Sequence, residues 1–304
     1  MNGVNRLARI ALNSPDAGRL ARFYVDALGF RLSAVAGGDV DAAAIDALEE
    51  GGRDRMDVVL GATRLTLHTV TGRRYPDDVA GWSPLFQHCA IVVADMTVAL
   101  RSLEAASSTH RWTPISTEGP QRLPANTGHV AAFKFRDPDG HPLELLAFPA
   151  GDDRRAGPRT ARVDHSAISV ADVAHSVAFY EDLGFAVRGR TLNAGPAQQR
   201  LDDIEDPQVD IVALSPPEGT LHVELLGYRG DFPRAVEPAA LDDVAATRLV
   251  LEVGPDALPA LVHRHRDRLA TAPRENRIVV RDPDGHLIEL RVPHRPQPLN
   301  PAVR

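Results

Sequence analysis

The stretch HCAIVVAD at residues 88–95 recurs as HSAISVAD at residues 165–172, with six of the eight positions identical. Each copy begins with a histidine and ends with an aspartate. Ile91 and Val93 alternate with smaller residues, which indicates a strand with one buried face. An aspartate directly after such a strand is suited to cap the N-terminus of a following helix. The repeated unit is therefore predicted to be a strand that leads into a helix.

Longer repeats surround this pair and define the organisation of the chain. FYVDALGF at 23–30 returns as FYEDLGF at 179–185, and DPDGHPLEL at 137–145 returns as DPDGHLIEL at 282–290. The 304 residues therefore divide into two similar halves. We predict an N-terminal domain over 1–150, a linker over 149–160 that is rich in Pro, Gly and charge, a C-terminal domain over 161–295, and an irregular tail over 294–304.

Each half is itself double. The strand-and-aspartate phrase also opens the first quarter, as RIALNSPD at 9–16, and the last quarter, near TRLVLEVGPD at 247–256. Every quarter then continues with a helical spacing of apolar residues and with alternating or β-branched runs that predict strands. The chain is thus expected to contain four modules of the same kind.

Composition narrows the class of protein. The net charge is −7 and no run of Lys and Arg dominates, which argues against a nucleic-acid partner. We expect no signal peptide and no membrane-spanning segment, because no apolar run is long enough. The single cysteine, Cys89, fits a reducing cytoplasm. A metal site in this chain would have to use His and carboxylate ligands.

The repeated motifs, in register four times, resemble the vicinal oxygen chelate superfamily, which includes glyoxalase I, bleomycin-resistance proteins and extradiol dioxygenases. The resemblance covers nearly the whole chain as a two-domain member. It implies an α+β fold of four βαβββ modules in two tandem glyoxalase-like domains, with paired sheets that form metal-binding cups. It also implies that the metal ligands come from the first and last strands of each paired module.

Carried over position by position, the resemblance implies two unequal cups. The second and third quarters supply a complete set of metal ligands, which comprises His88, Glu144, His165 and Glu224. The first and fourth quarters supply Arg9, His68, Arg248 or Leu249, and Glu289, a set that we interpret as a metal-free vestige. An alternative pairs the modules within one half, and then His68, His88 and Glu144 would form a site of two His and one carboxylate.

The complete set favours a metal enzyme with one divalent ion per chain. Imidazole and carboxylate ligands suit Zn, Fe, Ni, Co or Mn and do not choose among them. The ion would act as a Lewis acid on a small oxygenated substrate, and Glu224 or Glu144 would be the catalytic base. The protein is expected to be a monomer or a homodimer whose only partner is its small-molecule substrate. His222, Trp82 and Phe86 are possible substrate contacts, whereas Asp164 and Lys134 are expected to be exposed.

Three functions stay open at this point. The first is a glyoxalase- or epimerase-type lyase or isomerase that stabilises an enolate. The second is an extradiol-type Fe(II) dioxygenase, which generally uses two His and one Glu, so that Glu224 counts against it. The third is a non-catalytic protein that sequesters a drug such as bleomycin, which would lack the metal set.

Overall fold

The computed structural model describes residues 3–33, 55–149, 161–233 and 236–293. The predicted linker, except for Pro149, and the predicted tail, 294–304, lie outside the described residues. Their boundaries therefore stay predictions.

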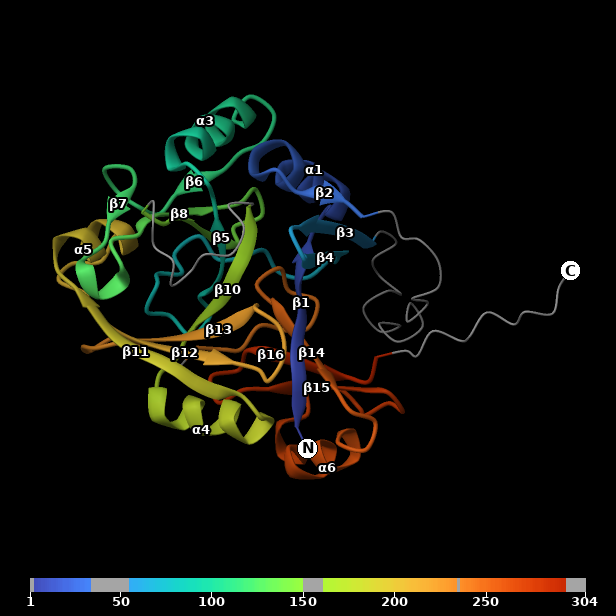
Figure 1. The fold of residues 1–304 in the computed structure, drawn as a ribbon. Helices are drawn as coiled ribbons and strands as arrows, with labels where there is room; N and C mark the ends of the chain where they lie inside the picture. Colours follow the sequence, from blue (N-terminus) through green and yellow to red (C-terminus); the bar gives the residue numbers. More distant parts are fainter. Residues whose placement is uncertain (1–2, 34–54, 150–160, 234–235, 294–304) are drawn as a thin grey trace, which may run out of the picture.

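The described elements follow the four modules along the chain (Figure 1). The first two modules contain β1 (Val4–Ser14), α1 (Ala17–Leu28), β2 (Arg31–Leu32), β3 (Arg55–Leu60), β4 (Thr63–Thr69), β5 (Gln87–Val92), α3 (Met96–Ala106), β6 (Thr113–Pro114), β7 (Gln121–Arg122), β8 (Ala131–Arg136) and β9 (Pro142–Ala147). The last two contain β10 (Arg162–Ser169), α4 (Val173–Leu183), β11 (Ala186–Ala194), α5 (Pro196–Asp202), β12 (Gln208–Ser215), β13 (His222–Tyr228), β14 (Arg248–Val253), α6 (Leu258–Arg264), β15 (Arg277–Arg281) and β16 (Leu287–Arg291). Short 3₁₀ turns cover 125–127 and 266–268.

The repeated aspartates and glycines begin and end the helices as the sequence predicts. The carboxylates of Asp16, Asp95 and Asp172 each accept a hydrogen bond from a backbone N–H in the first turn of α1, α3 and α4. Gly29 and Gly184 end α1 and α4 with φ values of 72° and 107°, a conformation that a residue with a Cβ adopts only at a cost. Three of the four modules therefore place their helix by the same local chemistry.

Each of the two sheets combines one module from each half of the chain. The seven-stranded sheet has the order β15-β16-β14-β1-β4-β3-β2, and the nine-stranded sheet has the order β11-β12-β13-β10-β5-β9-β8-β6, with β7 paired to β8. The two modules of a sheet meet along an antiparallel pair, β1 with β14 and β5 with β10. The predicted α+β fold of paired modules is confirmed, and the pairing runs across the two halves.

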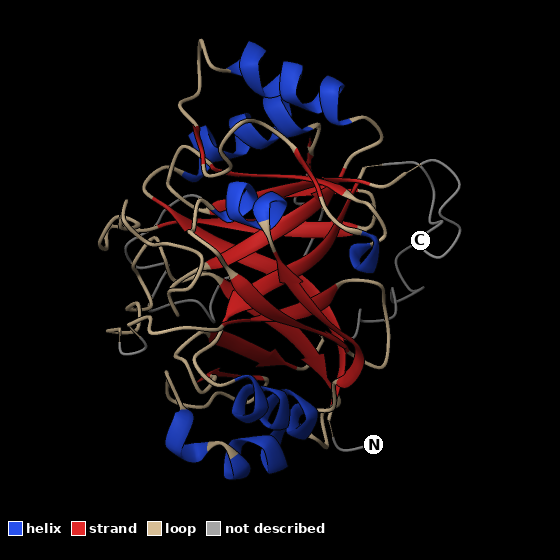
Figure 2. Cartoon of the chain, turned by 90° about the vertical axis from the view of Figure 1, so that its left-hand side faces the viewer, coloured by secondary structure: helices blue, strands red, loops and turns tan. Residues whose placement is uncertain are grey.

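The strands occupy the middle of the molecule, with α1 and α3 at one end, α4 and α6 at the other, and α5 beside the nine-stranded sheet (Figures 1 and 2). Helices α1 and α3 pack together at one end, and Arg264 of α6 donates to Asp182 of α4 at 3.0 Å at the other. The main hydrophobic core contains apolar residues of both sheets and of the helices, so the two sheets are stabilised together. No helix in the described part of the chain is long and apolar enough to cross a membrane.

The two antiparallel junctions share a register that shows which residues correspond. In β10 and β5, His165 lies opposite Ala90 and Ala167 lies opposite His88, just after a bulge. In β1 and β14 the same bulge precedes Arg9, which lies opposite Val250, while Ala11 lies opposite Arg248. Arg9 therefore corresponds to His165, and Arg248 to His88. Leu249, the other candidate for that position, pairs with Ile10 in the core and is excluded.

The register corrects one assignment made from the sequence. Glu224 of β13 lies level with Ala167, whereas the residue of β4 level with Ala11 is Thr66. Thr66, and not His68, thus corresponds to Glu224, and His68 lies two residues further along the same face. Counting the same number of residues from Arg9 as from His165 leads to His68. The count fails because paired residues of the parallel strands are 57 residues apart in one case (His165 to His222) and 55 in the other (Arg9 to Arg64).

Candidate metal centre

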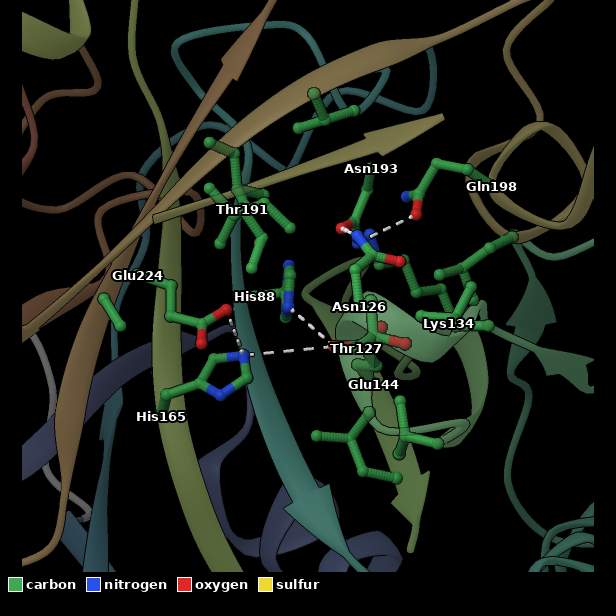
Figure 3. A pocket seen from close by; sticks show the side chains of 18 of the residues that line it. His88, Asn126, Thr127, Lys134, Glu144, His165, Thr191, Asn193, Gln198 and Glu224 are labelled. Carbon is green, nitrogen blue, oxygen red and sulfur yellow. Dashed lines mark hydrogen bonds and ion pairs between the residues drawn. The ribbon is translucent and has the colours of Figure 1, made fainter. Parts of the chain in front are cut away.

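Four strands of the nine-stranded sheet bring the predicted ligands to one face. His88 lies on β5 and His165 on the neighbouring β10, while Glu144 comes from β9 and Glu224 from β13, which run parallel to β5 and β10. Paired residues on neighbouring strands point to the same face, so the register itself places the four side chains together. Figure 3 shows them directed into one cavity from both sides of the β5–β10 junction.

The donor atoms converge on the carboxylate of Glu144. His88 Nε2 lies 3.2 Å and His165 Nε2 lies 3.9 Å from Glu144 Oε2, and the ligand atoms of these three residues lie within 4.8 Å of one another. Glu224 Oε2 lies 3.6 Å from His165 Nε2, on its other side. The three residues His88, Glu144 and His165 are buried, so their donor atoms are shielded from bulk water. Two imidazoles and two carboxylates in this arrangement can hold a divalent cation.

The charges of the site support this interpretation. Burial favours neutral groups, but the carboxylates of Glu224, Asp164 and Glu144 outweigh it and raise the pKa of His165 to about 9. Burial likewise opposes ionisation of Glu224, yet His165 and His222 lower the pKa of Glu224 to about 2. Ionised carboxylates around a protonated imidazole make a site that attracts positive charge. Two carboxylates and two neutral imidazoles would balance a dication.

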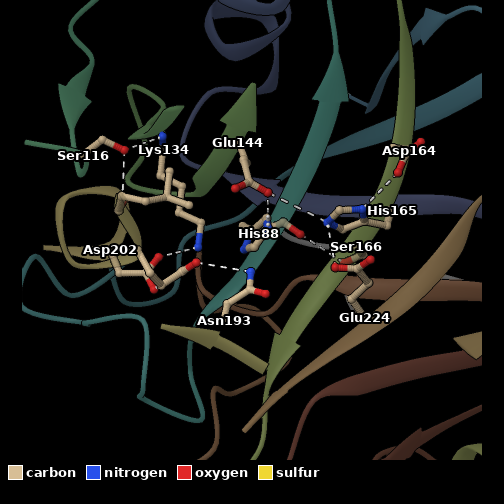
Figure 4. Close-up of polar contacts among 12 residues, drawn as sticks. His88, Ser116, Lys134, Glu144, Asp164, His165, Ser166, Asn193, Asp202 and Glu224 are labelled. Atoms are coloured by element: carbon tan, nitrogen blue, oxygen red, sulfur yellow. Dashed lines mark hydrogen bonds and ion pairs between the residues drawn. The ribbon is translucent and has the colours of Figure 1, made fainter. Parts of the chain in front are cut away.

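Asp164 fixes the orientation of the His165 ring. Its Oδ2 lies 3.2 Å from His165 Nδ1, and this contact leaves Nε2 to face Glu144 and Glu224 (Figure 4). The sequence predicted an exposed Asp164, but its side chain is buried. A carboxylate behind a histidine is the arrangement that orients many metal-binding imidazoles. The only sequence signal was its position next to His165.

Replacing Asp164 with Asn is expected to weaken the binding of a divalent metal by about 10- to 100-fold, because the His165 ring loses the charged acceptor that orients it. Competition with a metal-binding dye measures the change. Asp210→Asn, which alters an exposed carboxylate paired with Arg229, serves as the control and should leave the affinity unchanged. An Asp164→Asn protein with unaltered affinity would contradict this role.

The cavity beside the four residues has a volume of about 190 Å³. Its apolar lining includes Leu123, Val130, Leu146, Val209, Ile211 and Leu226. Its polar lining includes Asn126, Thr127, Lys134, Asn193 and Gln198 (Figure 3). The space suits a small molecule with an apolar part and several oxygen atoms.

A buried ion pair holds Lys134, one of the polar residues that line the cavity. Lys134 Nζ lies 2.6 Å from Asp202 Oδ1, and both side chains are buried (Figure 4). Asp202 also accepts hydrogen bonds from Gln198 at 2.7 Å and from Tyr228 at 2.9 Å. The sequence predicted an exposed Lys134 and gave no indication of Asp202, since the two residues belong to different halves of the chain.

The remaining predicted residues lie around the site rather than in it. His222 stands next to His165, with ring centroids 5.3 Å apart, and its Nε2 lies 3.6 Å from Glu224. Trp82 stacks on Phe232 and Phe86 is buried in a hydrophobic cluster, and neither lines the cavity. The substrate contacts predicted for Trp82 and Phe86 stay predictions, and Phe86 packs edge-on against His88 with ring centroids 5.8 Å apart.

The alternative site with His68 is also wrong. His68 lies on β4 of the seven-stranded sheet, whereas His88 and Glu144 lie in the nine-stranded one. Among the described residues, the groups that could hold a metal comprise His88, Glu144 and His165, or Asp164, His165 and His222. Neither group contains His68.

Comparison with known proteins agrees with this architecture. No curated protein matches the chain in a sequence search. Glyoxalase I from Zea mays superimposes with a TM-score of 0.60 at 16% identity, covering 95% of this chain and 92% of the maize chain. A candidate dioxygenase from Bacillus subtilis superimposes with a TM-score of 0.53 at 13% identity, covering 96% of this chain and 86% of the other. At these identities the likeness shows the fold alone.

The sequence comparison settles the family. The family model described as "Glyoxalase/Bleomycin resistance protein/Dioxygenase superfamily" matches residues 6–145 and again residues 162–290, which together make up most of the chain. The two matched segments coincide with the two halves defined by the internal repeats. The protein is a tandem member of the glyoxalase/bleomycin resistance protein/dioxygenase superfamily.

Proposed function

We propose that this protein is a divalent-metal-dependent lyase or isomerase of the glyoxalase or epimerase type, acting on a small oxygenated substrate. The observation that carries the proposal is the buried group of His88, Glu144 and His165, with Glu224 at 3.6 Å from His165. These four side chains would hold the ion. When bound, it would supply a Lewis acid that polarises a carbonyl or hydroxyl oxygen of the substrate.

Glu224 is the better candidate for the proton acceptor. Glu144 is held by a hydrogen-bond contact of 3.2 Å with His88. Glu224 makes only longer contacts, 3.6 Å to His165 and 3.6 Å to His222, and its side chain is more exposed than that of Glu144. It can therefore move toward a substrate in the cavity with less loss of interaction energy. Glu144 would stay in place as a fixed anion.

The cavity would orient the substrate for this step. Its apolar side chains would cover the hydrocarbon part and exclude water from the reacting carbon. The amides of Asn126, Asn193 and Gln198 are linked to one another by hydrogen bonds, and their remaining donors and acceptors would meet oxygen atoms of the substrate. A substrate with a proton next to a carbonyl, and with further hydroxyl or carboxylate oxygens, fits this mixed lining.

Replacement of Glu224 by Gln tests the proposal. In deuterated buffer and at saturating metal, the wild type is expected to exchange a proton next to the carbonyl in members of a panel of small α-hydroxy and α-oxo carbonyl compounds. Glu224→Gln should slow this exchange by about 10²- to 10⁴-fold, because the amide cannot accept a proton. NMR detects the exchange, and Glu289→Gln in the other sheet should leave it unchanged. Full exchange by Glu224→Gln would contradict the assigned role.

A second candidate function is an Fe(II) dioxygenase. The donor atoms of His88, Glu144 and His165 cluster without Glu224. Two histidines and one carboxylate are the ligands that Fe(II) oxygenases use, which favours this function. Oxygen consumption with catechols under Fe(II) would support this function, and Glu224→Gln would then retain activity. If the purified protein had no affinity for divalent metals, a protein that sequesters a small molecule would instead be favoured.

A further inference from the structure

The seven-stranded sheet carries an unusual concentration of arginine on the face that corresponds to the metal centre. Arg9 lies level with Arg64, and Asn13 with His68, which in turn lies opposite Arg55. Glu252 lies opposite Arg291, which lies opposite Arg277. Paired residues share a face and residues two apart do so as well. The arginines that these registers place on the face include Arg9, Arg55, Arg64, Arg248, Arg277 and Arg291.

Two of these arginines occupy the positions that histidines take in the metal centre. Arg9 corresponds to His165 and Arg248 to His88, as the strand registers show. Arg248 is 1% exposed and Arg9 is 9% exposed. A divalent cation at this place would meet two fixed positive charges instead of two imidazole donors. The face therefore cannot be a second copy of the metal site.

Several guanidinium nitrogens on this face lack a hydrogen-bond partner. Arg9 Nε, Arg55 Nε and Arg248 Nη2 are buried and have no acceptor. Arg248 Nη1 donates to Asn13 Oδ1 at 3.3 Å, so this arginine is held in place while its Nη2 stays unsatisfied. A buried guanidinium without an acceptor costs free energy, and such groups are normally paired.

The carboxylates of the face do not satisfy these groups. Asp57 is engaged by Arg55 at 3.2 Å and by Arg64 at 3.6 Å. Glu289 stabilises the charged forms of Arg9 and Arg248 electrostatically, but burial outweighs this and lowers the pKa of Arg9 to about 10. Glu289 is the main carboxylate acting on both buried arginines, and Asp57 adds a smaller effect on Arg9 alone. The charge and the open donors both call for a further anion.

We propose that the arginine face of the seven-stranded sheet binds a small multivalent oxyanion, of the phosphate or dicarboxylate type, held by Arg9 and Arg248 with Arg55 beside them. A planar guanidinium presents paired N–H donors that match the oxygens of a carboxylate or phosphate. Unsatisfied nitrogens on three arginines allow several such bonds at once. The protein would then combine a cation site in one sheet with an anion site in the corresponding place of the other.

Thermal unfolding of metal-free protein in the presence of anions tests this proposal. Inorganic phosphate and malonate are titrated separately, each against sodium chloride at equal ionic strength, because a bound ligand raises Tm by mass action. The wild type is expected to show a saturable rise in Tm with at least one of the two probes. The two titrations distinguish a phosphate site from a dicarboxylate site. Calorimetric titration then gives the dissociation constant.

Variants locate the binding. Arg248→Met and Arg9→Gln are each expected to raise the dissociation constant of the anion by about 10-fold or more, since each removes a charged donor. His165→Gln in the metal centre and Arg229→Gln on the surface should both leave it unchanged. Arg9→Gln provides the test if Arg248→Met fails to fold. The proposal is overturned if neither probe gives a saturable shift, if the shift persists in Arg9→Gln, or if it disappears in His165→Gln.

Discussion

Replacing Lys134 with Met is expected to lower the free energy of unfolding by about 3–5 kcal/mol, the usual cost of breaking a buried ion pair from one side. Lys134 Nζ lies 2.6 Å from Asp202, and the two side chains are 5% and 1% exposed. Methionine fills similar space but leaves the carboxylate of Asp202 with only Gln198 and Tyr228 as donors. An uncompensated negative charge would then stay buried in the wall of the cavity.

Chemical denaturation of the metal-free protein measures this loss. Arg229→Met breaks an exposed ion pair with Asp210 and should leave the free energy of unfolding nearly unchanged, because surface ion pairs contribute little. The double variant Lys134→Met/Asp202→Asn removes both charges and should recover a large part of the lost stability. A loss below about 1 kcal/mol in the single variant would show that Lys134 does not neutralise Asp202 in the folded protein.

Replacing His165 with Gln is expected to weaken divalent-metal binding by more than about 100-fold and to abolish the metal-dependent reaction. Loss of a direct ligand exceeds the effect of losing its orienting partner. His165 belongs to both groups of residues that could hold a metal, and its Nε2 faces Glu144 at 3.9 Å and Glu224 at 3.6 Å. Glutamine keeps a polar side chain of similar size but cannot supply an imidazole nitrogen.

Metal titration followed by calorimetry checks this expectation. His68→Gln changes a buried histidine in the other sheet and should keep the wild-type affinity. The comparison separates a specific ligand from a general effect of removing a buried imidazole. Unchanged affinity in His165→Gln would contradict the proposed centre.

Much of the fold and the composition of the site could be predicted from the sequence because both rest on local repeats. The strand phrase that begins with His88 and His165 fixes a register, and the aspartates that follow fix the helix starts. Because β5 and β10 carry the same pattern of side chains and pair with each other, their histidines lie on the same face of the sheet. The cross-half pairing follows once the intact ligand positions are grouped together.

The remaining features depend on contacts that no local pattern encodes. Lys134 and Asp202 are 68 residues apart and meet only after the two halves pair. Thr66 takes the place that the sequence assigned to His68, because the segment between the paired parallel strands is two residues shorter in the first module than in the third. Aligning the two modules at their helices cannot reveal this difference. Trp82 and Phe86 are aromatic residues near the site in sequence, but they pack against Phe232 and in a hydrophobic cluster, and neither is among the residues that line the cavity.

The central claim is that one divalent ion binds between His88, Glu144, His165 and Glu224. The described structure offers a competing group, Asp164, His165 and His222, which shares only His165 with it. His88→Gln and His222→Gln distinguish the two groups directly, because each variant removes a ligand from one group and none from the other.

The most direct measurement is elemental analysis of the wild type and these two variants after metal loading and exhaustive dialysis. The account predicts about one divalent ion per chain in the wild type and in His222→Gln, and almost none in His88→Gln. Retention of the ion in His88→Gln together with its loss in His222→Gln, or two tightly bound ions per wild-type chain, would contradict it.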